Sequence, residues 1–178
     1  DSVNWVDPNF NDATWQSGSG LLAFENNAAI AGLVGTALLA PNTPPPGLTS
    51  GHAYYFRTTV LATNDFIPAA LLGTFRTDDG AVVYVNGAEA LRIRMPSGVI
   101  GSQSLATEFP PGENTDATTD EPYSLQIIEL APGTNRIAAS VHQQNTNSSD
   151  VVWGMALDAV GYQRVRDTVV PTLVTLLP

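Results

Sequence analysis

Residues 78–87 read DDGAVVYVNG, and this stretch decides the fold class. Asp78-Asp79-Gly80 predicts a tight turn, in which Asp79 is expected to bond backbone amides. Residues 81–85 are rich in β-branched and aromatic side chains and predict a strand. Asn86-Gly87 then predicts a type I′ turn, because both residues readily adopt a positive φ. The stretch is therefore typical of a β-hairpin whose second strand covers residues 89–94.

Similar strand patterns lie on both sides of this hairpin. They predict strands over residues 53–62, 69–77, 123–130, 136–143 and 151–162. Thirteen prolines and fifteen glycines divide the chain into short segments, and helical periodicity is nearly absent. We therefore expect an all-β, antiparallel jelly-roll sandwich over residues 1–163.

The N-terminal third carries fewer strand signals. Residues 7–18 can form one turn of helix, with Asn11 or Asp12 as its cap. Residues 25–53 are expected to form a long Gly/Pro-rich connection, in which Pro44-Pro45-Pro46 adopts a polyproline II conformation.

Composition excludes several classes of function. The 178 residues suit one domain, and the net charge of −10 argues against nucleic acid, because few cations would neutralise phosphates. All seven basic residues are arginine, and there is no cysteine, which excludes disulfides and thiolate chemistry. No run is long enough to cross a membrane. The acidic, lysine-free chain suits a secreted protein, extracellular or on a cell surface, with carboxylates to spare for calcium.

Several short motifs follow one another along the chain, and DDGAVVYVNG is the longest of them. The others are Tyr55-Phe56-Arg57, Arg92, Met95-Pro96, Pro132-Gly133-Thr134-Asn135, Val141-His142-Gln143 and Ser148-Ser149-Asp150. The set resembles galactose-binding-like jelly-roll modules attached to secreted bacterial proteins, with a departure at Arg94, where those modules usually have Asn. The resemblance implies an accessory role, carbohydrate binding or cell-surface attachment, with calcium frequent in the wider fold. It also places Trp15 and Trp153 in the core.

Arg57, His142 and Gln143 are the candidate sugar-binding residues. The alternative for His142 is a core histidine with satisfied hydrogen bonds. A Ser149–His142–Asp150 hydrolase is a remote alternative, because the GxSxG turn of such enzymes is absent. We therefore expect no enzymatic activity.

Calcium is the one cofactor that the sequence indicates, in two acidic stretches. The first resembles a calcium loop without its usual Gly and final Glu, and a capped turn is the alternative. The second is an acidic loop, for which a solvated surface is the alternative. The candidate ligands are Asp7, Asn9, Asn11, Glu113, Asp116 and Asp120.

Residues 164–178 form the last unit, and within it residues 168–177 read TVVPTLVTLL, an uncharged apolar strand. Modules of the kind that the chain resembles start with a strand for which only nine residues are present here, before the Phe10–Trp15 turn. The surplus strand at the end can therefore replace a strand absent at the start. Pro171 lacks one ladder donor, so we expect an irregularity there.

Two interpretations of the tail remain open. It can fold back into its own sheet, which gives a monomeric, calcium-stabilised binding module for glycans. It can instead enter a neighbouring copy by donor-strand complementation, which gives a head-to-tail filament. We favour the filament subunit, in which the partner is a second copy of the chain. The expected interface residues are Val169, Val170, Leu173, Val174, Leu176 and Leu177.

Overall fold

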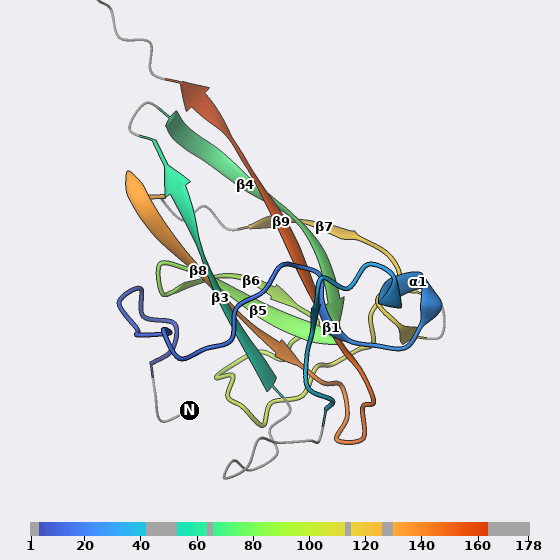
Figure 1. Cartoon of the computed structure of the whole chain (residues 1–178). Helices are drawn as coiled ribbons and strands as arrows, with labels where there is room; N and C mark the ends of the chain where they lie inside the picture. Colours follow the sequence, from blue (N-terminus) through green and yellow to red (C-terminus); the bar gives the residue numbers. More distant parts are fainter. Residues whose placement is uncertain (1–3, 42–52, 64–65, 113–114, 126–129, 164–178) are drawn as a thin grey trace, which may run out of the picture.

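The computed structural model describes residues 4–41, 53–63, 66–112, 115–125 and 130–163. In this part of the chain two β-sheets pack face to face (Figure 1). The elements in chain order are β1 (Leu22–Phe24), α1 (Ala28–Ala31), β2 (Thr36–Ala37), β3 (Ala53–Ala62), β4 (Phe66–Asp78), β5 (Gly80–Val85), β6 (Ala88–Ile93), β7 (Glu121–Leu125), β8 (Gly133–His142) and β9 (Val151–Gln163).

One sheet has five strands in the order β2-β1-β9-β4-β7, and the other has four in the order β3-β8-β5-β6. Every pairing is antiparallel except that of β1 with β2. The long β4–β9 ladder runs from Phe66 opposite Gln163 to Asp78 opposite Val152. The prediction of an all-β sandwich is confirmed.

All seven predicted strands are present, and their described boundaries differ by a few residues from those predicted. Residues 126–129 of the strand predicted over 123–130 lie outside the described residues. The central hairpin has the expected turn, because φ is +50° at Asn86 and +85° at Gly87. The Asn86 side chain also fastens this turn to β8. Its Oδ1 accepts from the backbone N–H of Arg136 at 2.8 Å, and its Nδ2 donates to Asn135 Oδ1 at 2.8 Å.

Two predictions for the N-terminal third were wrong. Residues 7–18 form no helical turn, because short side chains there hold non-helical turns. Asp7 Oδ1 accepts from Asn9 N at 2.8 Å, and Asn11 Oδ1 accepts from Ala13 N at 3.1 Å. Residues 25–53 are not simply a connection, because they contain α1 and β2. The three prolines lie outside the described residues.

An aromatic cluster fills the space between the sheets. Phe75 of β4 and Trp153 of β9 are buried, with ring centroids 5.9 Å apart, and Phe56 of β3 stacks on Trp153 at 5.8 Å. Trp153 is therefore a core residue, as expected. Trp15 is only half-buried and contacts Phe10 at 5.7 Å, so its predicted place in the core was wrong.

No helix in the described ranges is long and apolar enough to cross a membrane.

Candidate functional site: an apolar groove at one end of the sandwich

The ends of four strands lie together at one end of the molecule, at the upper left of Figure 1. There β4 begins beside the end of β9, since Phe66 pairs with Gln163. In the other sheet, β3 ends beside the start of β8, since Ala62 pairs with Gly133. The two sheets face each other at this end without a closing turn among the described residues.

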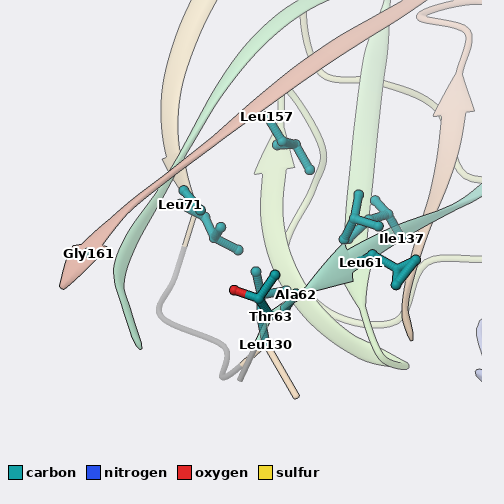
Figure 2. A pocket seen from close by; sticks show the side chains of 10 residues that line it. Leu61, Ala62, Thr63, Leu71, Leu130, Ile137, Leu157 and Gly161 are labelled. Carbon is teal, nitrogen blue, oxygen red and sulfur yellow. The ribbon is translucent and has the colours of Figure 1, made fainter. Parts of the chain in front are cut away.

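A groove of about 690 Å³ lies between these strand ends (Figure 2). Leu71 of β4 and Ile137 of β8 are buried, Val60 and Leu157 are half-buried, and Leu61 is 80% exposed. The lining residues are almost all apolar: Val60, Leu61, Ala62, Thr63, Leu71, Leu130, Ile137, Leu157, Ala159 and Gly161.

The outer face of the five-stranded sheet exposes further apolar side chains. Val160 and Tyr162 of β9 are 52% and 72% exposed, and Leu72 of β4 is 42% exposed. Because side chains alternate along a strand, these three point away from the groove that Leu71 and Leu157 line. In addition, β3 is the outermost strand of its sheet, so its outer backbone groups face away from the ladder.

The groove has the chemistry of a docking surface. Among the described residues, its lining contains no titratable side chain. An apolar partner would gain free energy by covering Leu61 and Leu157, and an extended peptide could also pair with the edge of β3. The groove therefore suits an apolar strand better than a polar sugar. The six residues expected to form a donor strand, which all lie in 168–177, are outside the described residues.

Arg57, the first candidate sugar-binding residue, ties the N-terminal segment to β3. Its side chain is only 1% exposed, its Nε donates to Asp12 Oδ2 at 2.9 Å, and one terminal nitrogen donates to the Asp7 carbonyl at 3.0 Å. The other terminal nitrogen donates to the Trp5 carbonyl. The guanidinium also lies 5.2 Å from the centre of the Phe10 ring. The hydrogen bond from Arg57 lowers the pKa of Asp12.

His142 and Gln143, the other two candidates, are also buried. Because a carbonyl oxygen only accepts, His142 Nδ1 donates to the Ser104 carbonyl at 2.9 Å, and Nε2 accepts from Ser140 Oγ at 2.8 Å. Burial lowers the pKa of His142 to about 4. His142 therefore has the satisfied bonds of a core histidine. In the β3–β8 ladder it pairs with Ala53, four positions from Arg57, so these candidates are not gathered around one opening.

The predicted calcium ligands are dispersed. Asp7 and Asn11 hold turns, Asn9 follows Asp7 in the same exposed turn, and Asp120 pairs with Arg76 at 2.8 Å. Glu113 lies outside the described residues. Asp116 is the exception, because it meets three other carboxylates.

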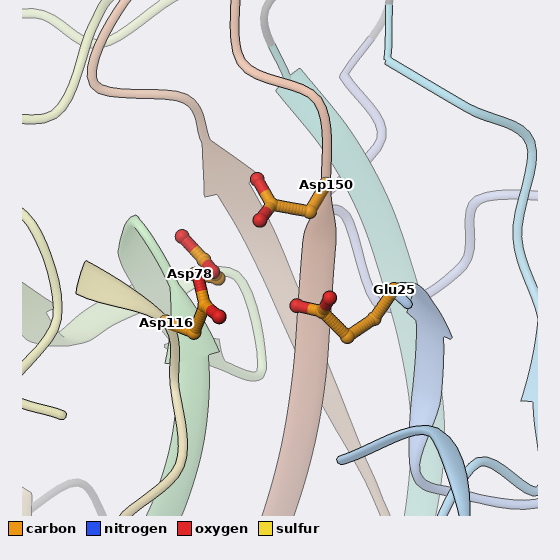
Figure 3. A group of neighbouring side chains, drawn as sticks. All are labelled: Glu25, Asp78, Asp116 and Asp150. Carbon is orange, nitrogen blue, oxygen red and sulfur yellow. The ribbon is translucent and has the colours of Figure 1, made fainter. Parts of the chain in front are cut away.

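Those three are Glu25, Asp78 and Asp150 (Figure 3). Burial, reinforced by the carboxyl of Asp79, raises the pKa of Asp78 to about 10, and burial also raises the pKa of Asp150. Sequence reasoning missed this cluster, although Asp78 and Asp150 belong to motifs that it singled out. Asp79 itself behaves as predicted, because its Oδ2 accepts from Gln144 N at 2.6 Å.

Comparison of the chain with known protein families, with curated proteins and with solved structures gives no match.

Proposed function

We propose that the protein is a structural subunit of an extracellular filament, in which the C-terminal apolar strand of each copy docks in the groove of the next. The observation that carries this proposal is the apolar groove of about 690 Å³ beside the end of β9. Gly161 lines the groove, and the chain continues for fifteen residues after Gln163. The occupant to which we commit is the segment 168–177 of a second copy.

The tail and the groove match in chemistry and size. Residues 168–177 carry no charge, and neither do the described residues that line the groove. Ten extended residues span roughly 33 Å, which is enough to follow β3 and cross the groove. Burial of six aliphatic side chains would contribute on the order of 9–18 kcal/mol before the costs of association and ordering are subtracted.

We also propose that the sandwich is a jelly roll, and the order of the strands in the two sheets supports this. From β3 to β9 the chain changes sheet at every step except the β5–β6 hairpin. Alternation of this kind between two antiparallel sheets is typical of jelly rolls and related sandwiches. The resemblance of the motifs and the acidic, lysine-free composition support the proposal that the protein is secreted.

The position of the tail relative to the groove allows two forms of tail exchange, a closed dimer and an open filament. The end of β9 and the groove lie at the same end of the sandwich (Figure 1). Two copies that exchange tails with each other would therefore close into a dimer, whereas a filament forms when each copy donates to one neighbour and accepts from another.

Deletion of residues 168–178 tests the proposal. We expect the full chain to form filaments visible by electron microscopy, and the shortened chain to remain a folded monomer with unchanged circular dichroism. A synthetic peptide of residues 168–178 should bind the shortened chain with one-to-one stoichiometry. Two variants of the full chain provide a matched test. Leu173→Asp should prevent assembly, and the control Thr168→Asp should not.

Three outcomes would overturn the proposal in different ways. A full chain that is monomeric would mean that the tail occupies its own groove, as a secreted binding module requires. A discrete dimer that dissociates on deletion would retain tail donation and exclude the filament. Filaments that survive the deletion would assign assembly to another surface.

A further inference from the structure

Four carboxylates from four separate segments meet at the end of the sandwich opposite the groove (Figure 3). Glu25 follows β1, Asp78 ends β4, Asp116 lies between β6 and β7, and Asp150 precedes β9. One oxygen of each lies within 4.8 Å of the others. Oxygens on opposite sides of one Ca²⁺ ion are roughly 4.6–5.2 Å apart, because each lies about 2.3–2.6 Å from it. The spacing therefore fits a single ion of this size.

Donors outside the cluster hold three of these carboxylates in position. Glu25 Oε1 accepts from the next two backbone N–H groups, at 2.6 and 2.7 Å. Asp116 Oδ2 accepts from Asn27 Nδ2 at 2.6 Å, and Asp150 Oδ1 accepts from Ser148 Oγ at 3.0 Å. Each carboxylate thus uses one oxygen for its support. Such outer contacts orient the ligands of protein metal sites.

Asp78 provides the observation that points to a ligand. The residue is only 2% exposed, yet its Oδ2 has no hydrogen-bond partner among the described residues, and neither does the buried Oε2 of Glu25. Figure 3 shows both carboxyl groups pointing into the cluster. A buried carboxyl oxygen without a hydrogen-bond partner destabilises the folded state. A cation between the four groups would remove this cost.

No basic side chain in the described ranges pairs with the cluster. Each arginine there forms its ion pair with an acidic residue elsewhere, and the buried ring of His142 is bonded to Ser104 and Ser140. These arginines are Arg57, Arg76, Arg92, Arg94 and Arg136. Among the described residues, the four carboxyl groups therefore have no cationic side chain as a partner.

We propose that Glu25, Asp78, Asp116 and Asp150 bind one Ca²⁺ ion. The donor set consists of carboxylate oxygens alone. Hard divalent cations such as Ca²⁺ prefer oxygen ligands, whereas softer metals prefer nitrogen or sulfur. The ion would join the segment after β1 and the loop before β7 to the ends of β4 and β9. It would therefore stabilise the short outer strands β1 and β2, and its role is independent of the groove.

The direct test is calorimetric titration of the full chain, freed of metal by chelation, with CaCl₂. We expect one binding site per chain. At a Ca²⁺ concentration roughly one hundred times the dissociation constant, the melting temperature should rise by about 5–10 °C. Amide exchange should slow most in residues 21–38 and 115–121. The same concentration of MgCl₂ should give a smaller rise, because Mg²⁺ keeps its water shell and demands a tighter octahedron.

Conservative variants identify the ligands. Asp78→Asn and Asp150→Asn should each weaken Ca²⁺ binding at least about tenfold, because each removes a charged ligand. Without metal, Asp78→Asn should melt close to the temperature of the wild-type protein, because the raised pKa of Asp78 keeps its carboxyl neutral there and asparagine is a neutral group of the same size. The matched control is Asp158→Asn, an exposed carboxylate on β9, which should leave Ca²⁺ binding unchanged.

The absence of both binding heat and a Ca²⁺-dependent melting shift in the wild-type protein would overturn the proposal. So would unchanged affinity in Asp78→Asn and Asp150→Asn. An equal shift with Mg²⁺ would overturn the assignment to Ca²⁺. Deletion of residues 168–178 should leave Ca²⁺ binding intact, so failure of this proposal and failure of the filament proposal are separate results.

Discussion

The two ends of the strand pair β4–β9 carry side chains of opposite polarity. At one end Asp78 and Asp150 contribute to a cluster of carboxylates, and at the other Leu71 and Leu157 line an apolar groove. Seven residues separate Asp78 from Leu71, which corresponds to roughly 23 Å along the strand. One continuous ladder thus connects the proposed cation site to the proposed docking groove.

The two ends of the sandwich differ in how the core is covered. Along the ladder, buried residues such as Phe75 and Trp153 fill the space between the sheets. At the carboxylate end, loops before and after the strands bring polar groups over the core and cover it. At the groove end Leu71 and Ile137 are buried, whereas Leu61 is 80% exposed and Val60 and Leu157 are half-buried.

The largest effect tests whether one core supports both ends. Phe75→Ala removes a fully buried ring that contacts Trp153 and Tyr123, and it should lower the free energy of unfolding by about 3–5 kcal/mol. Urea denaturation followed by circular dichroism measures this change. Thr74→Ala, at the exposed neighbouring position, is the control. A loss below about 1 kcal/mol would show that the two ends are stabilised separately.

The next largest effect is the loss of stability in acid at the carboxylate end of the sandwich. His142 lies at the carboxylate end, opposite Gly80, and its pKa of about 4 lies below the ordinary 6.5. The folded state therefore favours the neutral ring. Its contribution to stability is complete above about pH 6.5 and is lost as the pH falls towards 4, by about 3 kcal/mol in total.

The measurement compares wild-type protein with His142→Gln by urea denaturation between about pH 7.5 and pH 4. We expect the variant to lose less stability over this range, because glutamine does not titrate. Parallel curves for the two proteins would contradict a neutral buried histidine. Peptide binding at the groove of the shortened chain should change little between pH 7.5 and pH 6, since none of the described residues that line it titrates.

The smallest effect on stability concerns the rim of the groove. Leu61 is mostly exposed, so Leu61→Ser should change the free energy of unfolding of the shortened chain by less than about 0.5 kcal/mol. It should nevertheless weaken binding of the 168–178 peptide, because an apolar contact is lost. Fluorescence anisotropy of a labelled peptide measures the affinity. Thr58→Ser, exposed on the same strand, is the control, and equal affinity in both variants would exclude Leu61 from the interface.

Much of the sheet structure could be predicted because its signals are local. The run at 81–85 and the Asn86-Gly87 turn encode a hairpin through backbone preference, and no distant residue is needed. The outer elements could not be predicted in this way. Leu22–Phe24 and Thr36–Ala37 have only three and two residues, which is too short for a periodic pattern, and β1 exists because β9 provides a pairing partner.

For the candidate sites, too, some features could be predicted from the sequence and others could not. Sequence alone determined an acidic, cysteine-free β-sandwich with an apolar segment at residues 168–177, because composition and strand periodicity are properties of the chain itself. Only the tertiary structure decided that Asp116 meets Glu25, Asp78 and Asp150, and that His142 and Arg57 are buried. Those facts depend on strand register and on the packing of one sheet against the other. Both arise from contacts between residues far apart in the chain, which local preference does not encode.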